Sequence, residues 1–73
     1  MMTLHRLEKL RQQLALQQLD AVIIDSEHNR AYLSAFTGSA GTLFITKDEQ
    51  YLLTDFRYRV QSKEQSPHFT VIE

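Results

Sequence analysis

The sequence predicts an α/β fold: a mixed β-sheet with helices packed on both faces, three layers in all, in the order α-β-α-β-β-α-β. Two observations favour this class. Strand-like apolar runs alternate along the chain with segments of helical periodicity. The composition, 42% hydrophobic and 23% charged over 73 residues, is that of a folded chain. A chain of this length forms one small domain or part of one.

The N-terminal part is predicted to form a helix and then a strand. Over residues 3–18, leucines recur every three or four positions, which places them on one helical face. They are Leu4, Leu7, Leu10 and Leu14. Residues 19–25 then form a strand, because the central run from Ala21 to Ile24 is short, apolar and mostly β-branched. A strand that is apolar on both sides predicts helices on both faces of the sheet.

The middle of the chain is predicted to hold a helix and a hairpin. Ser26 suits the N-cap of a helix over residues 27–35. A loop at 37–41, which contains both glycines, ends this helix. Strand-like runs at 42–46 and 51–55, separated by a short polar connection, predict an antiparallel hairpin.

The C-terminal part is predicted to form a helix and a last strand. A polar helix over 57–65 ends at Ser66-Pro67, because proline cannot continue it. A strand follows at 69–72. The chain stops at Glu73 directly after this strand, which we interpret as the truncation of a longer domain.

Composition also limits the class of partner. The formal net charge of −1 gives no basic excess for nucleic acid or an anionic membrane. The longest purely apolar run, residues 21–24, is far shorter than the roughly 20 residues that span a bilayer. The chain has no cysteine, which excludes disulfides and is typical of a reducing compartment. We therefore expect a soluble, cytoplasmic protein that binds neither nucleic acid nor membrane.

The spacing of the two glycines argues against catalytic or phosphate-binding roles for their loop. A P-loop needs G-x-x-x-x-G-K-[ST] before a helix. Here Gly38 and Gly41 are three apart, no lysine follows, and a strand comes next. Ser39 lacks the strand-to-helix setting of a nucleophile elbow, and the three histidines fall in different elements. We expect the glycines to adopt conformations that other residues resist, including left-handed ones, with Ser39 in local hydrogen bonds.

The residues also argue against a complete metal or cofactor site in this segment. Zinc and iron sites use His, Cys and carboxylates at recognisable spacings. The sequence has no H-x-H, H-E-x-x-H or cysteine pair. Asp20 and Asp25 bracket the first strand, but the parity of their positions places them on opposite sides.

The segment Thr54-Asp55-Phe56-Arg57-Tyr58 lies where a strand ends and a helix begins. In α/β sheets, strand ends that face a crevice are common binding positions. Asp55 is suited to cap the helix, and Arg57 is suited to pair with Asp55 or to bind a carboxylate. A capped helix with a surface ion pair is the simpler interpretation, and a binding role stays open beside it.

Taken in order, several segments resemble a known family. They are Leu19-Asp20-Ala21, Tyr32-Leu33-Ser34-Ala35-Phe36, Thr37-Gly38-Ser39-Ala40-Gly41 and Leu53-Thr54-Asp55-Phe56-Arg57-Tyr58. The set is similar to the N-terminal domain of Xaa-Pro aminopeptidases, Xaa-Pro dipeptidases (prolidases) and creatinase. That domain carries L-D-A, Y-L-[ST]-G-F-x-G-S-A-G and T-D-G-R-Y in this order. In this chain Ala35, Phe56 and Gln18 stand where the family usually has glycine.

The resemblance implies a ribonuclease H-like, creatinase/prolidase-type N-terminal domain, of which residues 1–73 are the first part. It implies a parent metallopeptidase, a hydrolase that cleaves proline-containing peptides between an N-terminal residue and proline. Its C-terminal "pita-bread" catalytic domain, absent from this chain, is implied to bind two divalent metal ions, Mn²⁺, Co²⁺ or Zn²⁺. The implied partners are that catalytic domain and the other subunits of a dimer or larger homo-oligomer.

On this interpretation residues 1–73 hold no catalytic or metal-binding residue. Their implied role is to make oligomer contacts and to shape the entrance of the active site. The candidate entrance residues are Arg57, Asp55, Gly38, Ser39 and Gly41. Two alternatives remain open. One is a self-standing interaction module that pairs through an exposed edge strand at 69–72, and the other is the N-terminal domain of a creatinase-like, metal-free amidinohydrolase.

Overall fold

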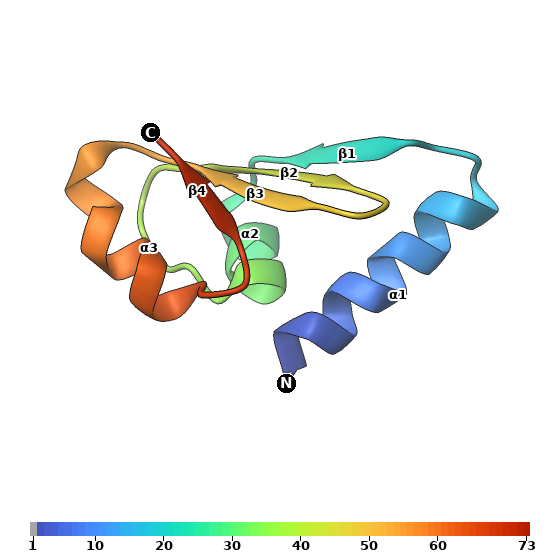
Figure 1. Cartoon of the computed structure of the whole chain (residues 1–73), viewed down its shortest axis with the longest axis horizontal. Coiled ribbons are helices and arrows are strands. Elements are labelled where there is room, and N and C mark those ends of the chain that lie inside the picture. The colour runs from blue at the N-terminus through green and yellow to red at the C-terminus, as the bar shows by residue number, and fades with distance from the viewer. Residues whose placement is uncertain (1) are drawn as a thin grey trace.

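The computed structural model describes residues 2–73 and confirms the predicted α/β class and order of elements (Figure 1). The helices are α1 (Met2–Leu16), α2 (Glu27–Ser34) and α3 (Arg59–Gln65), the last preceded by a 3₁₀ turn, η1 (Phe56–Tyr58). The strands are β1 (Ala21–Ile24), β2 (Thr42–Thr46), β3 (Gln50–Leu53) and β4 (Thr70–Ile72).

The four strands form one mixed sheet in the order β1-β2-β3-β4. β2 pairs antiparallel with both β1 and β3, which confirms the predicted hairpin. β4 returns parallel to β3 after η1 and α3. Among the described residues β1 and β4 are therefore the two edges of the sheet, and β4 is the edge strand that an interaction module would use.

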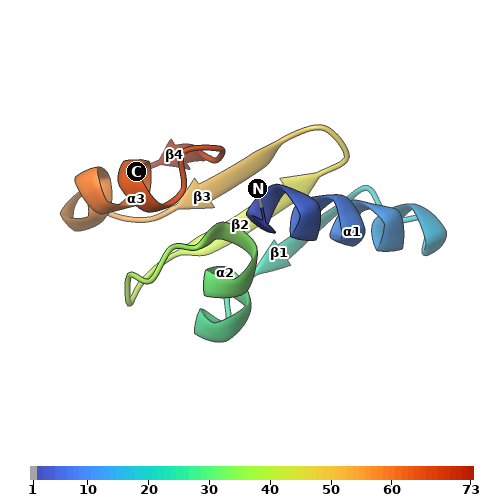
Figure 2. The same ribbon diagram turned by 90° about the horizontal axis from the view of Figure 1, so that it is seen from below.

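The core lies between one face of the sheet and the helices. The side chains of Leu43, Ile45 and Leu52 point to this face and are completely buried. They pack with four further buried residues from the helices and loops: Leu7, Leu33, Phe36 and Phe69. Figures 1 and 2 show α1, α2 and α3 on the same side of the strands. The leucine pattern of the first helix thus faces the core at Leu7, while Leu4 at its end is 40% exposed.

The expected helical layer on the second face of the sheet is not present within residues 2–73. Ile23, Leu53 and Ile72 point away from the helices and are 67%, 40% and 43% exposed. With Phe44 and Tyr51 they line an apolar groove of about 490 Å³ on this outer face. The apolar run of β1 correctly predicts that both faces of the sheet are apolar. All helices within residues 2–73 pack on one of these faces and leave the other uncovered.

Two non-glycine residues adopt left-handed backbone conformations, at the ends of the first two helices. Gln18 follows α1 with φ 58°, and Ala35 is the C-cap of α2 with φ 65°. A side chain costs energy in this region, which is why glycine is preferred at such helix ends. At both positions the family that this chain resembles usually has glycine. The left-handed backbone is a physical reason for that glycine. The N-cap of α2 is Ser26, as predicted, and its hydroxyl accepts from Asn29 N at 3.2 Å.

Candidate functional site

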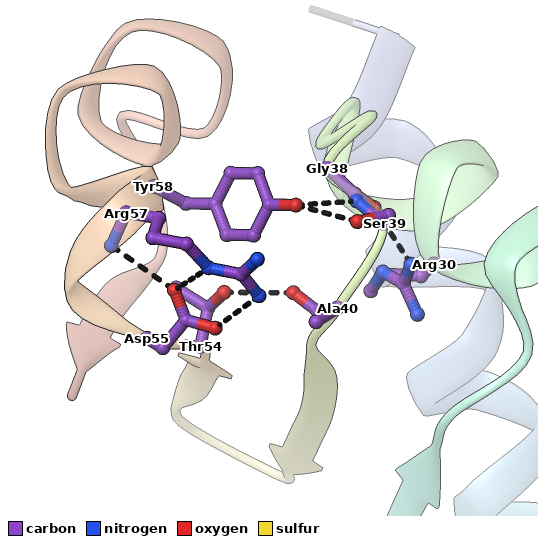
Figure 3. A network of polar contacts seen from close by, with 8 residues as sticks. All are labelled: Arg30, Gly38, Ser39, Ala40, Thr54, Asp55, Arg57 and Tyr58. Atoms are coloured by element: carbon purple, nitrogen blue, oxygen red, sulfur yellow. Dashed lines mark hydrogen bonds and ion pairs between the residues drawn. The ribbon is translucent and has the colours of Figure 1, made fainter.

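The loop at residues 37–41, which we call the glycine loop, and the segment at residues 54–58 meet at one end of the sheet. Thr54 Oγ1 donates to the Ala40 carbonyl oxygen at 2.7 Å, and Ser39 N donates to Tyr58 Oη at 3.3 Å. The Ser39 and Tyr58 hydroxyls lie 2.5 Å apart. Figure 3 shows the loop held in this way against Thr54, just after β3, and Tyr58, at the end of η1.

Asp55 and Arg57 form the capped turn and ion pair that the sequence predicted. Asp55 Oδ1 accepts from the backbone N of Arg57 at 3.0 Å and so caps η1. The Arg57 guanidinium donates Nε to Oδ1 at 3.0 Å and Nη2 to Oδ2 at 2.8 Å. These bonds lower the pKa of the Asp55 carboxyl. Because the two side chains are 60% and 40% exposed, the pair adds little to folding stability. Its clearer effect is to fix the direction of the Arg57 side chain.

An open hollow of about 330 Å³ lies between these elements. It is lined by the end of the loop and the start of β2, by the end of β3 and the two residues after it, and by the last two residues: Ala40, Gly41, Thr42, Leu53, Thr54, Asp55, Ile72 and Glu73. Glu73 in turn makes a two-bond pair with Arg59, at 2.7 and 2.9 Å. The hollow is therefore bordered by two carboxylates, each held by an arginine.

The role predicted for the glycines is wrong in its conformational part. Neither glycine has a positive φ. A side chain at Gly38 would place its Cβ 2.3 Å from Cζ of Phe36, a ring that is completely buried and packs edge-on against Tyr58 at 5.4 Å. At Gly41 a Cβ would lie 3.3 Å from Cδ of Arg30. Close approach to packed side chains, rather than a left-handed backbone, explains both glycines.

Arg30 is a residue of this site that the sequence did not reveal. It lies in α2 beneath the glycine loop, is 3% exposed, and donates to the carbonyl oxygens of Gly38 and Gly41 at 2.8 Å each. An arginine in a short polar helix normally predicts a solvent-exposed side chain. The only local signal was its place seven residues before the first loop residue, which does not specify a contact.

The Ser39 hydroxyl does not have the partner that a serine nucleophile requires. A serine nucleophile needs a general base, whereas the hydroxyl of Ser39 pairs with a phenol. This hydrogen bond lowers the pKa of Tyr58. Within residues 2–73, no three His, Cys, Asp or Glu side chains come close enough together to hold a metal ion.

No helix within residues 2–73 has the length and apolar character needed to cross a bilayer.

Comparison with known proteins identifies the class of domain. Residues 6–73 match the model of the creatinase/prolidase N-terminal domain. The chain is 43% identical over 68 residues to the uncharacterized peptidase YqhT of Bacillus subtilis, covering 93% of this chain and 19% of that protein. It is 39% identical over 75 residues to Xaa-Pro aminopeptidase 2 of Rattus norvegicus, covering 86% of this chain and 11% of that protein.

Solved structures agree with this class. The N-terminal domain of the cytoplasmic peptidase PepQ from Mycobacterium tuberculosis superposes with a TM-score of 0.89 at 43% identity, covering 94% of this chain and 55% of that one. The X-prolyl aminopeptidase of Caenorhabditis elegans, a cytosolic enzyme with a di-nuclear active site, gives 0.85 at 27% identity, covering 99% and 16%. The chain therefore belongs to the creatinase/prolidase N-terminal domain family. It spans less than a fifth of the length of the two curated relatives named above.

Proposed function

We propose that residues 1–73 are the first part of the non-catalytic N-terminal domain of an Xaa-Pro peptidase. The observation that carries this proposal is the family match over residues 6–73. Relatives in this family include Xaa-Pro aminopeptidases of which this chain spans only a small share. We infer a parent hydrolase that releases an N-terminal residue linked to proline, acts in the cytoplasm and assembles as a homo-oligomer.

The metal ions of the proposed parent belong outside residues 1–73. The related X-prolyl aminopeptidase has a di-nuclear active site, which supports a catalytic domain with two divalent ions. The described residues contribute no ligand cluster to it. Purified residues 1–73 should therefore fail to cleave an Xaa-Pro dipeptide or peptide in the presence of Mn²⁺. Turnover that follows the fragment through every purification step would refute this part of the proposal.

The glycine loop and the Asp55–Arg57 pair are proposed to form part of the active-site entrance. The support is geometric. Arg57 is an exposed cation whose direction is set by two bonds to Asp55, and its guanidinium lies 5.3 Å from the centre of the Tyr58 ring. Asp55 lines the open hollow and holds the Arg57 guanidinium, and a guanidinium positioned in this way can donate to a carbonyl of a peptide.

The test is Arg57→Ala in the full-length peptidase that carries this segment. We expect KM to rise by about threefold or more, with kcat nearly unchanged, because the lost contact acts on substrate binding. The preference for peptide length should also change. Lys47→Ala is the matched control, since Lys47 makes an exposed ion pair with Asp20 at 3.6 Å beyond the other end of β2. Equal kinetics for Arg57→Ala and Lys47→Ala would remove Arg57 from the entrance.

The outer face of the sheet is proposed to be covered by the part of the same N-terminal domain that follows residue 73 in the parent. The solved N-terminal domain of PepQ matches 94% of this chain but extends well beyond the match, since the chain covers 55% of it. The exposed apolar side chains of Ile23, Leu53 and Ile72 give that additional segment a surface to pack on.

A further inference from the structure

Arg30 is a buried cation whose hydrogen bonds all go to backbone carbonyl groups. Its side chain donates to the carbonyl oxygens of Asp25 at 3.3 Å and of Gly41 and Gly38 at 2.8 Å each. Its Nε is buried without a hydrogen-bond partner, and the three oxygens to which its side chain donates are all neutral carbonyls. Burying a guanidinium is costly unless bonds compensate for the lost water.

The geometry connects one side chain to both glycines of the glycine loop. The planar guanidinium presents several N–H groups in a fixed arrangement. Its two terminal nitrogens reach the carbonyls of Gly38 and Gly41, so the backbone between them cannot open without breaking a charge-assisted bond. Gly41 fits this contact because it has no Cβ, which would lie 3.3 Å from Cδ of Arg30. Figure 3 shows the bond from Arg30 to Gly38.

The opposite side of the loop carries the contacts of the candidate site. The residues between the two clamped carbonyls are Ser39 and Ala40, and they bond to Tyr58 and Thr54. Arg30 thus holds the loop from α2, while Tyr58 at the end of η1 and Thr54 just after β3 hold it from the other side. The two sets of bonds share no atom.

We propose that Arg30 is a positioning residue that fixes the glycine loop at the entrance of the active site. It acts through the backbone of the loop and does not itself contact substrate. The proposal rests on the proposed function only in placing this loop at the entrance. The clamp itself is a property of residues 30–41 and is testable by itself.

Substitution of Arg11 is the matched control. It tests whether losing any arginine with several hydrogen bonds loosens the glycine loop by destabilising the whole fold. It also donates to three oxygens, the carbonyls of Thr46 and Glu49 and the side chain of Gln50, at 2.7 to 2.9 Å. These contacts join α1 to the β2–β3 turn, away from the glycine loop. Arg11→Lys and Arg30→Lys therefore remove the same kind of multiple contact and keep the charge, and they differ in which loop is released.

The decisive measurement is backbone ¹⁵N relaxation by NMR on the chain of residues 1–73. In Arg30→Lys we expect the order parameters of residues 37–41 to fall from about 0.85 to about 0.6 or lower, while those of β2 and β3 are unchanged. Arg11→Lys should leave the glycine loop rigid. Gly41→Ala places a methyl group against Arg30 from the loop side and should loosen the same residues. If Arg30→Lys does not fold, Gly41→Ala provides the test of the proposal.

Two results would overturn the inference. One is a glycine loop that stays as rigid in Arg30→Lys and Gly41→Ala as in the original chain. The other is an equal loosening of β2 and β3, which would make Arg30 a general stabilising residue.

Kinetics of the full-length peptidase test the separate claim that the glycine loop lies at the entrance of the active site. If the loop loosens but the KM of Arg30→Lys is unchanged, the clamp stands and the loop's proposed place at the entrance fails. A several-fold rise in KM at constant kcat supports both.

Discussion

Replacing Ala35 by glycine should stabilise this chain, although glycine normally weakens helices. Ala35 is the C-cap of α2 with φ 65° and ψ 8°, and its N–H bonds to the Ala31 carbonyl oxygen at 2.8 Å. An L-residue in the left-handed region costs roughly 1–2 kcal/mol. Against this, glycine loses about 0.5–1 kcal/mol more conformational entropy on folding than alanine. Ala35 is exposed, so removal of its methyl group uncovers no core.

The difference predicts a gain of about 0.5–1 kcal/mol in the free energy of unfolding for Ala35→Gly. In a domain of this size that corresponds to a rise of roughly 2–8 °C in Tm. Urea denaturation followed by far-UV circular dichroism measures the change directly. With a denaturant slope of about 1 kcal/mol per molar, the midpoint should move up by roughly 0.5–1 M.

Ala31→Gly is the matched control, because Ala31 lies inside the same helix, where glycine is expected to cost about 1 kcal/mol. The two substitutions remove the same methyl group four residues apart and should have opposite signs. If Ala35→Gly destabilises the chain as much as Ala31→Gly does, the left-handed conformation is not costly here and the reasoning is refuted. Gln18→Gly, at φ 58°, should repeat the gain.

Three further predictions concern the loop, the ion pair and the outer face. Gly38→Ala should lower the free energy of unfolding by about 1–3 kcal/mol, because the new Cβ displaces the buried ring of Phe36; an unchanged urea midpoint would contradict the steric account. The folded-state pKa of Asp55 lies below its unfolded value, so the pair's contribution is present at neutral pH and lost as pH falls from about 4 through the folded pKa. Asp55→Asn should therefore reduce the acid-induced loss of stability, and an identical pH profile would contradict this. Ile23→Lys should make residues 1–73 more soluble but destabilise the full-length protein, in which we propose that Ile23 is covered; a neutral effect on full-length stability would refute that cover.

Local signals located the regular elements because their causes lie within a few residues. Ser26 and Asp55 cap their helices through the backbone N–H groups of Asn29 and Arg57, two or three positions away. The hairpin likewise depends on two adjacent apolar runs and a short polar connection. The predicted helix at 57–65 begins instead with the 3₁₀ turn η1, which Asp55 caps, and α3 starts only at Arg59.

The candidate site was predictable only in part. The sequence located the glycine loop and the Thr54–Tyr58 segment and predicted the Asp55–Arg57 pair. It did not show that Ser39 meets Tyr58, nor that the glycines make room for Phe36 and Arg30. Those contacts depend on how α2 and η1 pack around the end of the sheet, and no spacing of residues within either segment specifies this packing.

The sequence by itself determined the class of fold, the order and type of the elements, the N-caps Ser26 and Asp55 and, through an ordered set of motifs, the family of the domain. These follow from periodicity, capping chemistry and residue order, all of which are readable along a contiguous chain. The tertiary structure alone decided that the helices cover a single face, that Arg30 is buried beneath the glycine loop, and that the left-handed positions fall on Gln18 and Ala35 rather than on a glycine. The physical reason is that burial, close approach and the direction of a helix exit depend on which non-adjacent segments pack together.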